Sequence, residues 1–111
     1  MRPAIPPQAI EMYQDDRGRV PFADWLESLK NRTARIAIMA RIRRVSIGLF
    51  GDCKSVGSGV FELRVKVGPG YRVYFATVDD KIVLLLAGGD KSTQAGDIER
   101  AKDRLKDWRQ R

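Results

Sequence analysis

The residues best suited to chemistry lie in one stretch of the chain, between Val60 and Lys91. Arginine stays charged and binds phosphate oxygens through two N–H groups at once. A carboxylate can accept a proton or pair with an arginine, and a lysine can donate a proton. Such a set suits a phosphate group, and the stretch supplies Glu62, Arg64, Arg72, Tyr74 and Lys91. The alternative is that these side chains form the solvated face of an ordinary antiparallel sheet.

The spacing within this stretch predicts three antiparallel strands. Apolar and polar residues alternate over 61–67 and again over 71–77, and a Gly-Pro-Gly turn separates the two runs. A period of two places alternate residues on opposite faces of a sheet. The third run, 82–87, is apolar throughout, as expected for a central strand, and Lys91 follows it. If the first two strands pair, the following side chains share one face: Glu62, Arg64, Arg72 and Tyr74.

The rest of the chain predicts a strand and three helices around this stretch. A short alternating run indicates a strand over 8–14, and Pro21 is suited to the first position of a helix. Apolar spacing predicts a second helix over 34–47 and a final helix over 93–108, with Ser92 or Thr93 as its cap. The order of strand, two helices, three strands and helix is typical of the α+β class.

The second predicted helix is apolar on two sides, and such a helix needs two neighbours. The sheet and the first helix are one pair of candidates. A groove for a partner chain, centred on Ile36 and Ala40, is the other interpretation. The two apolar stripes are Ile38, Ile42 and Val45 on one side, and Ile36, Ala40 and Ile47 on the other.

The same helix is strongly basic, because no acidic residue occurs between Asn31 and Gly51. Phosphates of a nucleic-acid backbone attract such an array without regard to sequence, whereas a solubilising face more often mixes signs. We therefore expect an RNA contact at Arg41, Arg43 and Arg44. A glycine-rich loop over 49–59 adds Lys54 just ahead of the charged strand, but its spacing does not match a P-loop.

Composition limits the classes of protein that remain. The 111 residues fit a single domain, 1–111, and the formal net charge of +7 favours a polyanion or an acidic partner. The chain has one cysteine and no histidine, so we expect no disulfide framework, no metal site and no cofactor. It has no apolar run of membrane-spanning length and no signal peptide, so we expect no membrane association and a cytoplasmic protein.

Together these segments resemble the RelE/ParE superfamily of type II toxin–antitoxin toxins, within it the HigB-like branch of addiction-module killer proteins. The matching pieces are PFADWLESL, ARIAIMARIRRVSIGLFGDCKSVGSGVFELRVKVGPGYRVYF and LLLAGGDKSTQAGDIERAK. The resemblance implies a RelE-like fold, in which two N-terminal helices pack on an antiparallel sheet of about four strands, plus a C-terminal helix. It also implies a cognate antitoxin, often a helix-turn-helix DNA-binding protein, through which the toxin reaches operator DNA.

The resemblance further implies a metal-independent endoribonuclease that cuts mRNA on the ribosome and arrests translation. Arg64 in FELRV and Arg72 in GYRVYF match the two arginines of the sheet motif, and Lys91 falls where related nucleases place a catalytic residue. Glu62 resembles the base of some members, or it orients an arginine. Lys54 and Tyr74 would contact RNA, Tyr74 by stacking on a base or binding a phosphate. The chain departs from the family pattern in having no histidine.

Two other functions stay open at this point. ParE-type members share the fold and inhibit gyrase without cutting RNA, so the fold does not decide the activity. A toxin-fold protein that has lost its activity could also serve in antitoxin binding and operon repression. Neither alternative requires Glu62, Arg64, Arg72 and Lys91 to occur together.

Overall fold

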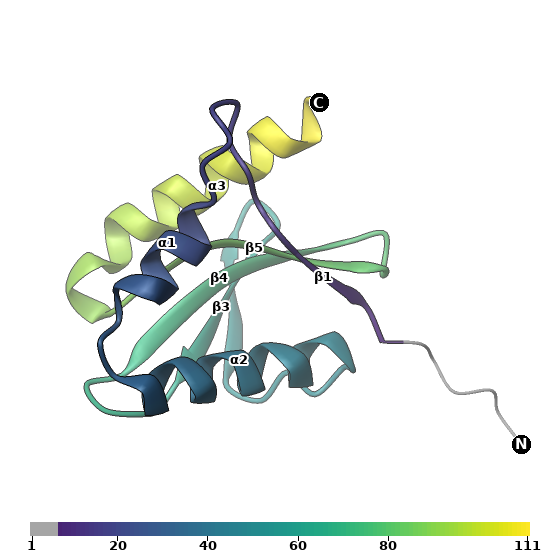
Figure 1. The fold of residues 1–111 in the computed structure, drawn as a ribbon. Helices are drawn as coiled ribbons and strands as arrows, with labels where there is room; N and C mark the ends of the chain where they lie inside the picture. Colours follow the sequence, from purple (N-terminus) through teal and green to yellow (C-terminus); the bar gives the residue numbers. More distant parts are fainter. Residues whose placement is uncertain (1–6) are drawn as a thin grey trace, which may run out of the picture.

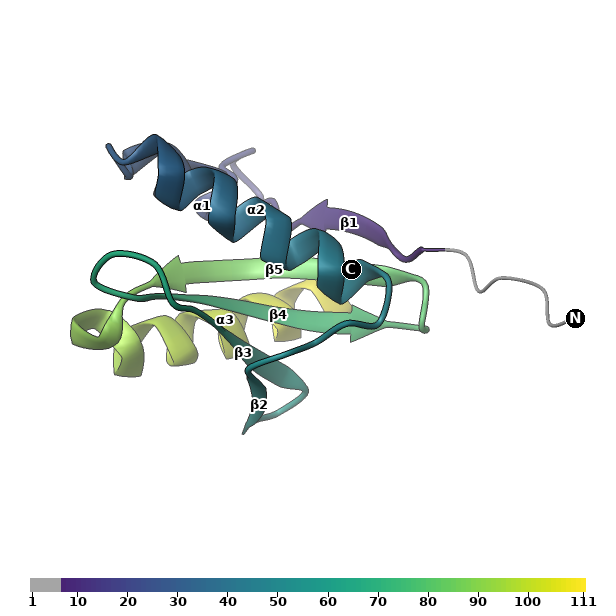
Figure 2. The same ribbon diagram turned by 90° about the horizontal axis from the view of Figure 1, so that it is seen from below.

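The computed structural model describes residues 7–111, which form a five-stranded sheet with helices on both faces (Figure 1). Figure 2 shows α1 and α2 on one side of the sheet and α3 on the other. The elements in chain order are β1 (Ala9–Met12), α1 (Pro21–Ser28), α2 (Arg32–Ser46), β2 (Cys53–Gly57), β3 (Val60–Val65), β4 (Tyr71–Val78), β5 (Ile82–Gly89), a 3-10 turn η1 (Lys91–Thr93) and α3 (Gln94–Arg109). The α+β class predicted from the sequence is confirmed.

The strand order is β1-β5-β4-β3-β2, and all neighbours are antiparallel except β1, which runs parallel to β5. The sheet therefore has five strands rather than about four. The additional strand is β2, which lies in the segment predicted to be a loop. Its short sequence, CKSVG, has little alternation, and it becomes a strand because it pairs with β3 across a tight turn at Ser58.

The sheet face under α1 and α2 is an apolar core. Alternate residues of β3, β4 and β5 point to it, as the period of two predicts. Their side chains are Leu63, Val65, Val73, Phe75, Val83 and Leu85, and they pack with Phe22, Ile38, Ile42 and Val45 from the two helices.

The other sheet face is also covered, because α3 lies across it. The buried residues there are Val60, Tyr74, Ala76, Leu84, Leu86 and Ala87 of the sheet and Ala101 and Leu105 of α3. The alternative of a solvated charged face is therefore wrong for most of this surface. A pattern of alternation assigns residues to faces, but it does not reveal which faces a later helix will cover.

Helix α2 begins at Arg32, two residues before the predicted start, and the Asn31 side chain caps it by accepting a hydrogen bond from the backbone N–H of Ala34. Its second apolar side does not pack as the simpler interpretation expected. Ile36 is 59% exposed and Ile47 is 58% exposed, because the sheet and α1 contact the side that carries Ile38. Part of the helix is thus apolar and open to solvent.

Thr93, one of the two predicted residues, is the N-cap residue of α3, but its side chain makes no capping hydrogen bond to the helix backbone. The side chains of Asp90 and Thr93 instead form a capping box around the 3-10 turn η1. The Thr93 hydroxyl also forms a 2.5 Å hydrogen bond to buried Asp97. Within residues 7–111, no helix is both long enough and apolar enough to cross a membrane.

Candidate functional site

Glu62 is the centre of a charged cluster at one end of the sheet face that α3 covers. In the register of the sheet, Glu62 on β3 lies opposite Lys54 on β2 and Tyr74 on β4. Arg64 lies opposite Arg72, one residue pair further along the same face. The side chain of Glu62 is fully buried. An ionised carboxylate in such a place requires positive partners and hydrogen-bond donors.

Glu62 has those partners on every side. Its Oε2 atom accepts hydrogen bonds from Gln94 Nε2 at 2.7 Å and from the Tyr74 hydroxyl at 3.1 Å. Arg64 Nε lies 3.4 Å from Oε1, and Arg72 Nε lies 3.6 Å from Oε2. Lys54 Nζ is 3.9 Å from Oε1. The carboxylate thus holds three cations together that would otherwise repel one another.

The protonation states follow from this environment. Burial raises the pKa of Glu62, but the hydrogen bonds from Gln94, Tyr74 and Arg64 and the charge of Lys54 outweigh it and hold that pKa below its usual range. Burial and the adjacent Glu62 carboxylate raise the pKa of the Tyr74 phenol well above its usual value. Glu62 is therefore ionised and Tyr74 neutral around pH 7. The geometry favours the second role considered for Glu62, that of an ion-pair partner that orients the arginines.

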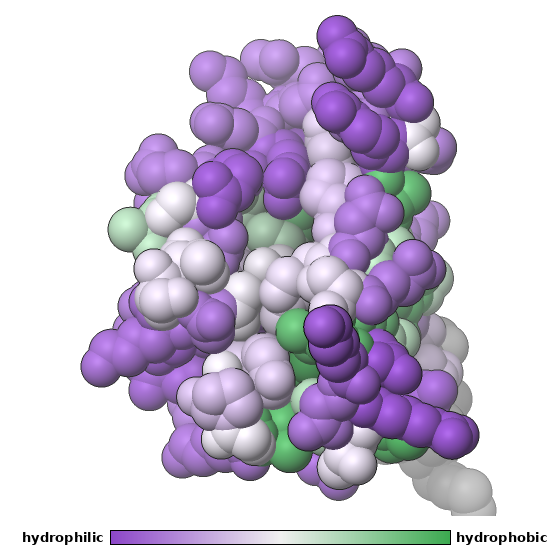
Figure 3. Space-filling view, turned by 60° about the vertical axis from the view of Figure 1, so that its left-hand side comes forward, coloured by the Kyte–Doolittle hydropathy of each residue, from purple (hydrophilic) through white to green (hydrophobic). Residues whose placement is uncertain are grey.

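The three cations differ in their access to solvent. The side chains of Lys54 and Arg64 are 52% and 39% exposed, whereas that of Arg72 is 17% exposed. Arg72 Nε is buried and has no hydrogen-bond partner in the described part of the chain. The face of the molecule drawn in Figure 3 carries mainly hydrophilic side chains, with apolar ones between them. An anion from solvent would meet Lys54 and Arg64 first and Arg72 beneath them.

Lys91 follows the strand end that pairs with Arg72. The last residue of β5, Gly89, is opposite Arg72, and Lys91 comes two residues later at the start of η1. Two Cα–Cα steps of 3.8 Å limit the distance between the Cα atoms of Lys91 and Gly89 to about 7.6 Å. The Lys91 side chain is exposed and forms no ion pair within residues 7–111. The role of Lys91 in the site stays a prediction.

Two glycines allow helices to approach this end of the sheet from both faces. A Cβ atom at Gly88 would lie 2.1 Å from the Trp25 ring of α1, and one at Gly89 would lie 1.8 Å from Asp97 of α3. A larger residue at either position requires these side chains, or the helices that carry them, to shift. The close contact at Gly89 positions the start of α3 against the sheet. This position brings the Gln94 side chain to Glu62.

No pattern in the sequence singles out Gln94. A single glutamine at the start of a helix is common, and 32 residues separate it from Glu62. Only the packing of α3 across the sheet brings the two side chains together. The Gly88-Gly89 pair was a usable signal of close approach, although the sequence did not say what would approach.

Tyr74 does not fit the role of a platform for an RNA base. Its ring is fully buried under α3, and its hydroxyl donates to Glu62. Base stacking requires an exposed ring face, so the prediction of stacking is wrong in this structure. A direct bond from Tyr74 to a phosphate is equally blocked. Its contribution is to hold Glu62.

The basic residues of α2 are not part of the Glu62 cluster, because α2 covers the opposite sheet face. The half-buried side chain of Arg41 donates to the backbone carbonyls of Phe50 at 3.2 Å and Arg64 at 3.4 Å. It therefore tethers the loop before β2 to the sheet. Arg43 and Arg44 are exposed, and their contact with RNA remains a prediction. Within residues 7–111, no group of three or more His, Cys, Asp and Glu could hold a metal ion.

Comparisons with known proteins bear on the family and the fold of the chain. Residues 24–106 match the family described as "Phage derived protein Gp49-like (DUF891)". A protein of Haemophilus influenzae described as uncharacterized is 54% identical over 81 residues, which cover 73% of this chain and 82% of that protein. The structure of a mutant Escherichia coli toxin RelE in the free state superposes with a TM-score of 0.68 at 17% identity. That match covers 89% of this chain and 98% of the RelE chain.

Proposed function

The chain belongs to the Gp49-like family of the RelE/ParE superfamily, and from this premise we propose that it is a type II toxin that cuts mRNA on the ribosome. The observation that carries the proposal is the cluster of Lys54, Arg64 and Arg72 around buried Glu62. This cluster keeps an excess of positive charge and faces solvent at one end of the sheet. A ParE-like gyrase inhibitor would not need such a site.

The proposed reaction uses the RNA itself as the nucleophile. The 2′-oxygen loses its proton and attacks the adjacent phosphorus, the bond from phosphorus to the 5′-oxygen breaks, and the 5′-oxygen gains a proton. The products are a 2′,3′-cyclic phosphate and a 5′-hydroxyl. Arg64 and Arg72 stabilise the additional negative charge of the phosphorane, because they are charged and held in place before the substrate arrives.

The proton transfers involve the rim of the site. Glu62 is enclosed by its donors and by its ion pairs, so in this proposal it positions the arginines and does not take the 2′-proton, which passes to solvent. Lys91 is the acid for the leaving 5′-oxygen, because its side chain is exposed and it follows the strand end that pairs with Arg72. Lys54 holds the phosphate on the other side.

The partners proposed are those of a toxin in the HigB-like branch: mRNA, the ribosome and a cognate antitoxin of the helix-turn-helix type. The cytoplasm is the compartment in which these partners occur. A groove between α1 and α2 suits the antitoxin. Its lining is apolar at Leu26, Ile36, Met39 and Ala40, and its charged residues are Arg32, Arg35, Arg43 and one acid, Glu27, so its charge is positive in balance. An amphipathic helix with acidic flanks complements it. Ile36→Glu should abolish antitoxin binding in a folded protein, and unchanged affinity would remove this surface from consideration.

The test of the nuclease proposal is a cell-free translation reaction. Purified protein is added, and mRNA 5′ ends are mapped by primer extension, with Arg64→Ala and Lys91→Ala beside the wild type. Arg17→Ala, which removes an exposed arginine of the β1–α1 connection, is the matched control. We expect new 5′ ends only during translation, for the wild type and the control, and their loss in the other two variants. Intact mRNA with the wild type would overturn the proposal, and a gyrase supercoiling assay would follow.

A further inference from the structure

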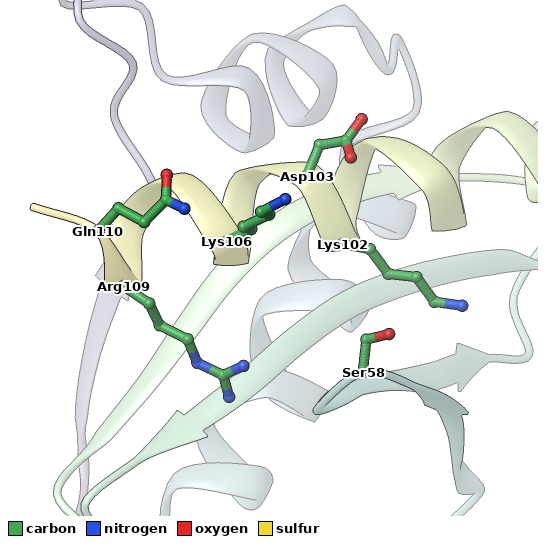
Figure 4. Close-up of a pocket in the computed structure, with 6 residues that line it drawn as sticks. All are labelled: Ser58, Lys102, Asp103, Lys106, Arg109 and Gln110. Carbon is green, nitrogen blue, oxygen red and sulfur yellow. The ribbon is translucent and has the colours of Figure 1, made fainter.

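A second cationic site lies outside the Glu62 cluster, in a groove between the C-terminal half of α3 and the β2–β3 turn. Its volume is about 550 Å³. The residues that line it are Ser58, Lys102, Asp103, Lys106, Arg109 and Gln110 (Figure 4). Apolar side chains are missing from this set, so the groove does not suit a ligand that binds through hydrophobic contacts.

The three cations of the groove follow one face of α3. Lys102, Lys106 and Arg109 are spaced at i, i+4 and i+7, which places them one above another on a helix. In Figure 4, Lys102 and Arg109 extend from the helix toward the β2–β3 turn, whereas Asp103 points to the other side of the helix. The one acid that lines the groove is therefore directed away from its basic side.

The cations of the groove differ from their neighbours in having no counterion within the described part of the chain. Arg100 on α3 and Arg111, two residues after its end, each pair with an aspartate at 2.8 Å. Lys102, Lys106 and Arg109 form no ion pair within residues 7–111. Like charges at this spacing destabilise a helix. The helix dipole favours cations in the last turn, which accounts for Lys106 and Arg109 but not for Lys102 near the middle.

The β2–β3 turn is built to pass close beneath the cations. Gly57, Ser58 and Gly59 have φ angles of 95°, 56° and 83°, which favour glycine. A Cβ atom at Gly59 would lie 2.8 Å from Arg109 Nη2, and one at Gly57 would lie 3.5 Å from Lys102 Nζ. Side chains at either glycine would occupy the space in front of the cations. The two glycines therefore keep the groove open.

Strand β2 connects the Glu62 cluster to the turn that borders the groove. Lys54 lies three residues before Gly57, about 10 Å along an extended strand. Lys54 is held beside Glu62, and Lys102 lies over Gly57. Positive charge thus extends from the arginine pair through Lys54 to Lys102 and on to Arg109. A chain with regularly spaced negative charges would contact all of it at once.

We propose that this groove binds the phosphate backbone of the RNA strand that occupies the Arg64–Arg72 site. The inference rests on the nuclease function proposed above, and it adds a surface that holds the RNA outside the reacting bond. The lining favours RNA over an acidic peptide, because it offers cations and no apolar pocket for a peptide side chain. Contacts of this kind bind without regard to base sequence.

The test measures RNA binding separately from cleavage. The probe is a short fluorescent single-stranded RNA with 2′-O-methyl groups, which cannot be cut by 2′-attack. The variant carries Lys102→Gln, Lys106→Gln and Arg109→Gln. The control carries Arg17→Gln, Lys30→Gln and Lys81→Gln, which remove the same charge from exposed positions outside the groove. Binding is followed by anisotropy over a range of salt concentrations, and circular dichroism checks the fold of each protein.

We expect the groove variant to bind the probe about tenfold or more weakly at low salt, with the slope of log affinity against log salt reduced by about 2. The control should change far less. Equal losses of RNA affinity in the groove variant and the control, or no loss in the groove variant, would overturn the proposal that the groove binds RNA. Weaker binding of a polyglutamate peptide in the groove variant, with unchanged RNA binding, would overturn it in favour of an acidic partner. If RNA binding depends on the groove but no mRNA is cleaved in the translation reaction, the groove proposal holds and the nuclease proposal is overturned.

Discussion

The two faces of the sheet are built from the same three strands, but different interactions stabilise them. The face under α1 and α2 is filled by aliphatic and aromatic side chains such as Leu63 and Phe75. The face under α3 has a similar apolar centre, but at one end it encloses the carboxylate of Glu62. The first face depends on volume and shape, whereas the second also depends on the charge balance of one residue.

This contrast shows why the cations of the second face can remain in place. Arg64 and Arg72 lie directly opposite each other on neighbouring strands, an arrangement that is normally unfavourable. Glu62 offsets their repulsion from within the protein and leaves solvent access to Arg64 and Lys54. On this face, the stability of the protein and its capacity to bind an anion are therefore linked through Glu62. On the other face, stability depends on apolar packing and is independent of anion binding.

The largest effect is expected when the buried carboxylate is removed. Glu62→Ala leaves the partly buried arginines without their counterion and should lower the free energy of unfolding by about 3–5 kcal/mol. Leu63→Ala, the neighbouring residue on the other face, should cost a similar 2–5 kcal/mol through a cavity. Urea denaturation measures both. Only the Glu62 loss should shrink when Arg64→Ala is added, and strictly additive losses would contradict the linkage.

The glycine pair offers a second comparison of the faces. Gly88→Ala and Gly89→Ala both force a helix away from the sheet and should each cost about 1–3 kcal/mol. Gly88→Ala should shift the fluorescence of Trp25, which lies against it. Gly89→Ala displaces the start of α3 and with it Gln94, so it should lower mRNA cleavage more strongly. Equal rates of mRNA cleavage by the two variants would show that the position of α3 on the sheet does not affect the site.

A smaller effect is expected at Gln94. Gln94→Ala removes a hydrogen bond to a buried charge and should cost about 1–2 kcal/mol in urea denaturation. Because Glu62 is then less firmly held, cleavage should fall in rate with little change in the affinity for RNA. Gln110→Ala, at the exposed end of the same helix, should change stability by less than about 0.5 kcal/mol. Equal rates in the two variants would remove Gln94 from the site.

The smallest effect is a dependence on pH. The pKa of Glu62 is lower in the folded protein than in the unfolded chain, so its contribution to stability is present above the ordinary glutamate pKa of about 4.3 and is lost as the pH falls through the folded value. The difference in unfolding free energy between wild type and Glu62→Gln should be constant near neutral pH and decline in acid. A difference that grows in acid would mean a raised pKa and would restore Glu62 as a candidate base.

The sequence by itself determined the class of the fold and the faces of its strands. Alternation over 61–67 and 71–77 predicted which side chains share a face, because the period of a strand is a local property. The positions of Glu62, Arg64 and Arg72 relative to one another followed from that pattern and the turn. The start of the first helix at Pro21 was equally local.

The tertiary structure alone decided how those side chains are used. Whether the charged face is open or covered depends on where α3 packs, and no local period encodes that position. The packing of α3 buried Tyr74, brought Gln94 to Glu62 across 32 residues, and placed Lys102 and Arg109 over the β2–β3 turn. The physical reason is that burial and charge pairing are properties of surfaces in contact, and the chain acquires those contacts only when its distant segments meet.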